Sequence, residues 1–268
     1  MVDTISAEST PELPPPSVPE NLPYSFPGFE GKEAAEQWRE IISSSISIIS
    51  SWLNLERLDG VTVAVNYAEA LATLDRGFET SVPLQASSDL VRGIGMAAPV
   101  IRNDVLKAQL VLDATYFSEL IHPASPRYKE FVYLLAHECA HVHDMRARDL
   151  TFPGMLLRRG APDIETGLRW QTSLSCWEEY AACRFSGSWN PDQIHYFEKT
   201  FCDFLDIARP RADERIQTYV KLQDEERLVV EVSREYRKLM TYASYVIGHL
   251  AGTKMELPET LDAKLARH

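Results

Sequence analysis

"YKEFVYLLAHECAHVHD", residues 128–144, is the stretch that decides the fold of this chain. It follows Pro126, a residue typical of the region just before a helix, and carries an H-E-x-x-H motif. Its apolar positions are those that a buried helix requires: Phe131, Leu134, Leu135, Ala140 and Val142. We therefore predict a buried helix with a polar motif in its second half.

The motif residues point to metal chemistry. Positions i and i+4 of a helix lie on one face about one turn apart, so His137 and His141 can hold one metal ion between them. Glu138 projects at a neighbouring angle, where it can take a proton from water as a catalytic base without being a ligand. These residues predict a Zn²⁺ site with its general base beside it. The alternative is that three polar residues fall into this order by coincidence.

A third protein ligand defines the class of a catalytic zinc site. The extended form H-E-x-x-H-x-x-G-x-x-H fails, because this chain has Asp144 and Ala147 where glycine and histidine are needed. A glutamate on the next helix is the other common solution, and "SCWEEYAACRFSG", residues 175–187, offers Glu178 and Glu179. The residue pattern leaves both open as ligands, and also allows a charged pair on an exposed helix face.

The two elements together resemble the ImmA/IrrE family of prokaryotic zinc metallopeptidases. The second element reads Glu179-Tyr-Ala-Ala182-Cys-Arg-Phe185-Ser186, and with the hairpin segment "LVLDATYF" the resemblance spans roughly residues 60–188. It implies that Glu179 is the third zinc ligand, that Glu178 is its solvent-side neighbour, and that the enzyme cuts regulatory DNA-binding proteins. Two features depart from the family pattern: a longer connection between the two elements, and Cys183 where asparagine or aspartate is usual.

The rest of the chain predicts an α+β fold: a zincin-like core with a small β-sheet and the H-E-x-x-H helix, then a mostly helical C-terminal half. The expected elements are a helix from Lys32 to about Leu58, a strand after Asp59-Gly60 that turns into a short helix, a β-hairpin with its turn at Arg102-Asn103-Asp104, a helix near 165–187, and helices over most of 191–250.

Three regions follow from this pattern. Residues 1–28 are proline-rich and predict a disordered or extended lead, because proline recurs too often for a helix or a central strand. Residues 29–188 form the predicted metallopeptidase core, and residues 189–268 the helical C-terminal region.

Composition limits the classes of partner. The net charge is −12 and the pI is near 5.1, which argues against direct nucleic-acid binding. No apolar stretch reaches membrane-spanning length, so we expect no membrane partner. The four cysteines form no C-x-x-C pair, and free thiols in a reducing compartment predict a cytoplasmic protein.

Several polar residues near the motifs have two possible roles. Asp144 could orient a zinc-bound histidine, or form with His143 a polar helix end. His195 and Tyr196 lie where an oxyanion stabiliser would be useful, although a surface role is the simpler interpretation. Cys139 fits a small buried thiol.

These patterns together predict a zinc-dependent metallopeptidase with a restricted set of intracellular protein substrates, a DNA-binding repressor among them. A basic partner would suit the acidic chain through electrostatic steering. Two rival hypotheses remain: a zinc-bound regulatory or interaction module that does not cleave, and a helical interaction protein in which the motif is coincidental.

Overall fold

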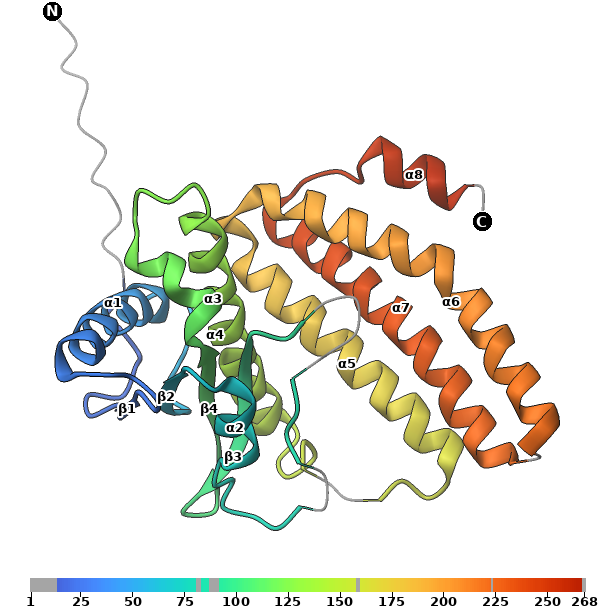
Figure 1. Ribbon diagram of the computed structural model, residues 1–268, viewed down its shortest axis with the longest axis horizontal. Helices are drawn as coiled ribbons and strands as arrows, with labels where there is room; N and C mark the ends of the chain where they lie inside the picture. The colour runs from blue at the N-terminus through green and yellow to red at the C-terminus, as the bar shows by residue number, and fades with distance from the viewer. Residues whose placement is uncertain (1–13, 81–82, 87–91, 158–159, 223, 267–268) are drawn as a thin grey trace, which may run out of the picture.

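The computed structural model describes residues 14–80, 83–86, 92–157, 160–222 and 224–266. It has an α+β fold with a four-stranded sheet and a mostly helical C-terminal half, which confirms the predicted α+β class and the helical C-terminal half (Figure 1). The strands and α-helices are β1 (Tyr24–Ser25), α1 (Lys32–Ser50), β2 (Leu58–Ala64), α2 (Tyr67–Ala72), β3 (Gly95–Arg102), β4 (Val105–Asp113), α3 (Ala114–Phe117), α4 (Tyr128–Thr151), α5 (Ile164–Ser186), α6 (Ile194–Leu222), α7 (Glu225–Thr253) and α8 (Glu259–Leu265).

The sheet is mixed, with strand order β1-β2-β4-β3. Strands β1, β2 and β4 run parallel, and β3 pairs antiparallel with β4 from Gly95↔Leu112 to Arg102↔Val105. The predicted turn joins β3 to β4, and both of its central residues, Asn103 and Asp104, have positive φ angles of 51° and 61°. Such a turn matches the twist of an antiparallel pair, and asparagine and aspartate tolerate this conformation. This hairpin leaves β3 at the edge of the sheet.

Helix α4 lies at the centre of the molecule. It packs against β3, β4 and α1 on one side and against α5 on the other (Figure 1). Helix α1 contributes a buried stripe at helical spacing to the same core: Trp38, Ile42, Ile46 and Ile49. The H-E-x-x-H motif is therefore held between the sheet and the C-terminal helices.

Helices α5, α6 and α7 lie side by side and form the C-terminal half (Figure 1). Two glycines of α7 allow it to approach α5 closely. A Cβ atom on Gly248 would lie 2.3 Å from the carbonyl oxygen of Tyr180, and one on Gly252 would lie 2.2 Å from that of Arg184. No larger side chain fits there without separating the helices. The contact brings α7 beside the segment of α5 that contains the paired glutamates.

The described part of the proline-rich segment, from residue 14 onward, packs on the core. Ser17 donates hydrogen bonds through its hydroxyl to the carbonyl oxygens of Ser50 and Leu53, and accepts one from the Leu55 backbone N–H. It thereby satisfies backbone groups where α1 ends, so α1 stops at Ser50 and not near Leu58 as predicted. The described residues 14–28 contain no helix. The prediction of a disordered or extended lead also covers residues 1–13, which lie outside the described residues.

Within the described ranges, no helix combines the length and the apolar character needed to cross a lipid bilayer.

Candidate metal centre

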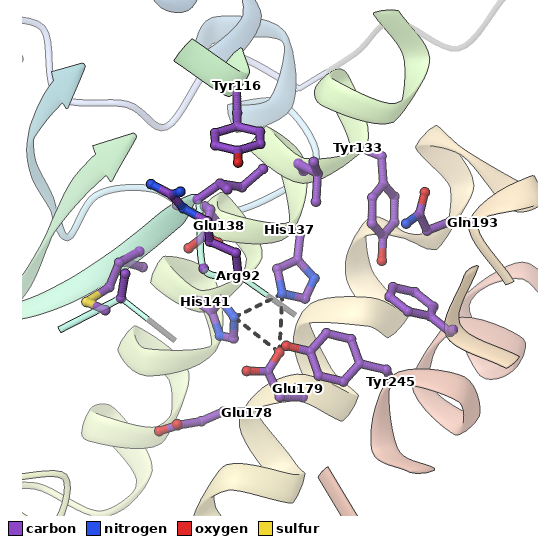
Figure 2. A pocket seen from close by; sticks show the side chains of 18 of the residues that line it. Arg92, Tyr116, Tyr133, His137, Glu138, His141, Glu178, Glu179, Gln193 and Tyr245 are labelled. Atoms are coloured by element: carbon purple, nitrogen blue, oxygen red, sulfur yellow. Dashed lines mark hydrogen bonds and ion pairs between the residues drawn. The ribbon is translucent and has the colours of Figure 1, made fainter. Parts of the chain in front are cut away.

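The two histidines of the motif face each other on the inner side of α4. Their Nε2 atoms lie 3.2 Å apart, and His137 is buried with 6% of its surface exposed. The spacing of four residues produces this pair, because it returns the side chain to the same helix face. The pair presents two ring nitrogens toward α5 (Figure 2).

Helix α5 provides the third group. Glu179 Oε2 lies 3.3 Å from His137 Nε2 and 3.6 Å from His141 Nε2. In a tetrahedral zinc site with bonds of about 2.0–2.1 Å, neighbouring ligand atoms stand about 3.3 Å apart. The three atoms therefore form a triangle of the size that one zinc ion requires, and they are the three-residue cluster in the described part of the chain able to hold a metal (Figure 2).

The Glu179 carboxylate gives an independent test of whether a cation fits. Its Oε2 atom is buried and has no hydrogen-bond partner among the described residues. Burial alone would raise the pKa of Glu179, but His141, His137 and the Tyr245 hydroxyl lower it below its usual value. A buried ionised oxygen without a donor is costly unless a cation pairs with it. A zinc ion between the three residues would remove that cost, so these residues fit the metal.

Glu178 points away from the histidines (Figure 2). Its Oε1 atom accepts a hydrogen bond of 2.9 Å from Arg148, which also pairs with Asp144 at 2.7 Å. Trp177 donates its indole N–H to the other oxygen of Asp144 at 3.0 Å. Glu178 thus belongs to a charged network that joins α4 to α5, and of the two glutamates only Glu179 faces the imidazoles.

Glu138 lies on the sheet side of the centre. It accepts a hydrogen bond from the Ala97 backbone N–H of β3, and a Cβ atom on Gly95 would lie 3.0 Å from its Cγ. The glycine therefore leaves the room that this side chain occupies. The pKa of Glu138 is raised to about 7, mainly by burial. The charge of Glu179 also raises this pKa, whereas His137 and the Ala97 N–H lower it. The carboxylate is accordingly suited to exchange a proton near neutral pH.

The centre opens into a pocket of about 690 Å³. Strand β3 and the preceding segment form one wall, and side chains of α5, α6 and α7 form the other. His137, Glu138, His141 and Glu179 all line it. A ligand in this pocket can therefore reach the three candidate ligands and Glu138 at the same time.

Two residues at the centre were not predicted. Tyr245 of α7 lies beside the Glu179 carboxylate (Figure 2), where its hydroxyl contributes to lowering the pKa of Glu179, and its ring stacks on His137 with the planes 9° apart. Cys183 of α5, noted in the sequence only as a departure from the family pattern, lies 3.8 Å from His137 Nδ1 through its sulfur. No local motif marks Tyr245, since its role depends on the packing of α7 on α5.

The remaining sequence candidates have other surroundings. Asp144 binds Arg148 and Trp177 and does not orient either histidine, so that alternative is wrong. His143 accepts a hydrogen bond of 2.8 Å from the Asn54 backbone N–H and holds a loop. Tyr196 lines the pocket, whereas His195 is exposed and is not among the lining residues. Cys139 is a fully buried thiol, as predicted.

Comparison with known proteins adds no relative: no family model matches this chain, and no curated protein or solved structure matches it either. The resemblance to the ImmA/IrrE family rests on the motif residues alone.

Proposed function

We propose that this protein is a zinc-dependent metallopeptidase with a zincin-like core, similar to the ImmA/IrrE family, in which His137, His141 and Glu179 bind zinc. One observation carries the proposal. Three ligand atoms from two helices form a triangle with sides of 3.2, 3.3 and 3.6 Å, and Glu138 stands beside it in the same pocket. A coincidental motif gives no reason for a glutamate of a second helix to meet both histidines.

The chemistry follows from the side chains. When bound, zinc supplies a Lewis acid and makes water acidic enough to attack near neutral pH. Glu138 accepts a proton from the attacking water and delivers it to the amide nitrogen that leaves. Burial raises the pKa of Glu138 above that of an ordinary glutamate, which helps a group that must both bind and release the proton in one cycle. The Ala97 N–H holds the Glu138 carboxylate toward β3.

The position of β3 supports a peptide as the substrate. It is one of the two edge strands of the described sheet, opposite β1, so one side of its backbone can pair with an extended peptide. At its far end Arg76 already occupies that side: the Ile101 N–H donates to the Arg76 carbonyl oxygen at 2.8 Å. The Arg76 Nε also donates to the Pro99 carbonyl oxygen at 3.1 Å. In this proposal the scissile bond would therefore approach the base near Gly95, the part of the edge beside Glu138.

Metal content is the first test of this proposal. We expect about one zinc per chain in the purified protein, and loss of that zinc in His141→Ala, because two ligands cannot hold the ion as three do. Plasma emission spectrometry after dialysis measures it. His143→Ala is the matched control, since His143 lies two residues away on α4 and contacts the Asn54 backbone N–H and the Phe185 ring and not the three candidate ligands in the described part of the chain. Wild-type protein that contains no zinc and does not bind added zinc would contradict the proposed metallopeptidase function.

We further propose a restricted set of intracellular protein substrates, a DNA-binding repressor among them. The net charge of −12 favours a basic partner through steering that salt weakens. We expect little cleavage of casein but cleavage of one or a few proteins in an extract of the source cells, slower at high salt. Terminal-peptide mass spectrometry with and without a zinc chelator measures both. Digestion of casein at many sites would contradict the proposed restricted substrate set, but it would remain consistent with a metallopeptidase.

A further inference from the structure

The second ring nitrogen of His137 faces a thiol. Cys183 Sγ lies 3.8 Å from His137 Nδ1, and Tyr133 donates its hydroxyl to the same sulfur at 3.6 Å. Both Cys183 and Tyr133 have no exposed surface. The chain of contacts runs from α4 to α5 and back to α4, one turn before the histidine.

These contacts are compatible with a proton on Nδ1 of His137. Tyr133 uses its proton on Sγ, and a sulfur that accepts from the hydroxyl can also accept from Nδ1–H. With its proton on Nδ1, the ring keeps a lone pair on Nε2, the atom that faces His141 and Glu179. A ligand histidine usually donates its other N–H to a carboxylate, a backbone carbonyl or water. In the described residues around His137 this place is taken by the thiol.

The charge of the centre gives a reason for a neutral acceptor. Glu138 and Glu179 already bring two carboxylates into this buried region, and the charge of Glu179 raises the pKa of Glu138. A third carboxylate at position 183 would add a like charge that burial makes costly. A thiol accepts the hydrogen bond without adding one.

We propose that Cys183 is a positioning residue of the metal centre: held by Tyr133, it fixes the ring orientation and the Nδ1–H tautomer of His137, so that Nε2 is ready for zinc. This rests on the proposed zinc site. Cys183 does not touch zinc or substrate in this proposal, and it acts only through His137.

Zinc affinity, measured by competition with a chromophoric chelator, tests the proposal without any substrate. We expect Cys183→Ala to weaken binding by about 10–100-fold, the usual cost of losing the partner of a ligand histidine. Cys183→Ser restores an acceptor and should recover much of the loss. The matched control is Cys139→Ala, which removes an equally buried thiol on α4 and should leave affinity unchanged.

A second measurement is histidine ring ¹⁵N NMR of the zinc-loaded protein. A cavity that only destabilised the fold would not change the protonated nitrogen of His137, so this measurement separates the two effects. We expect a protonated Nδ1 on His137 in the wild type and in Cys183→Ser, and loss of that pattern in Cys183→Ala. Unchanged affinity in Cys183→Ala, or an equal loss in Cys139→Ala, would overturn the positioning role while wild-type zinc binding stands. A wild type that binds no zinc would overturn the zinc site and this inference together.

Discussion

Glutamine in place of Glu138 should leave the protein with about one zinc per chain but reduce hydrolysis by about 10²–10⁴-fold, the usual contribution of a general base. The substitution keeps the size of the side chain and an oxygen that can accept from the Ala97 N–H. It removes the carboxylate that we propose accepts the proton of the attacking water. Zinc analysis and the rate of cleavage of a substrate found in cell extract, measured on the same preparation, give the two quantities.

Glu130→Gln is the matched control for Glu138→Gln. Glu130 lies on the same helix and lines the same pocket, but its carboxylate binds Arg127 at the surface. We expect this variant to keep both zinc and most of its activity. Equal hydrolysis by Glu138→Gln and the wild type would show that Glu138 is not the base. A wild type that holds zinc but cleaves nothing would favour the non-cleaving regulatory module.

The second large effect concerns the paired glutamates of α5. Glu179→Ala removes one of three proposed ligands and should weaken zinc binding by more than the ~10–100-fold that loss of an outer partner costs. Glu178→Ala should change zinc affinity little, because its carboxylate lies 2.9 Å from Arg148 and faces away from the imidazoles. Chelator competition on the two variants measures the difference directly.

The two glutamate variants also control for each other, since both remove one carboxylate from adjacent positions of the same helix. If Glu178→Ala loses zinc and Glu179→Ala keeps it, the assignment of the third ligand is wrong by one residue. If both variants keep zinc, the third ligand lies elsewhere in the chain, and the contact between Glu179 and the two histidines has another purpose.

The residue pattern of single segments was sufficient to predict those helices and turns whose conformation depends on neighbouring residues in the sequence. The apolar spacing of residues 128–144 predicted the buried helix α4, and Asn103-Asp104 predicted the hairpin turn. The same kind of reasoning placed a helix near 165–187, which the structure has as α5. In each case neighbours within a few residues determine the backbone conformation.

The orientation of α5 could not be predicted in this way. Consecutive residues of a helix point about 100° apart, so residue pattern alone could not tell which of Glu178 and Glu179 faces the histidines. The rotation of the helix depends on contacts between distant segments, such as Trp177 with Asp144 and Arg148 with Glu178. Only the family resemblance pointed to Glu179.

The residues that surround the candidate metal centre could not be predicted either, because they come from segments that are distant in the sequence. Tyr245 meets Glu179 because Gly248 and Gly252 let α7 approach α5. The capping of α1 by Ser17 likewise joins segments more than thirty residues apart. Proline content indicated that the lead is not helical, but it carried no information about where an extended segment would pack.

The place of Tyr245 in the chain has a consequence for synthesis on the ribosome. The four motif residues His137, Glu138, His141 and Glu179 leave the exit tunnel first. Tyr245, which stacks on His137 and lies beside Glu179, follows only with α7. A nascent chain therefore exposes the histidines and the base before the group that holds Glu179 has been translated. Assembly of the proposed metal centre with all its neighbours therefore has to wait until α7 has been translated.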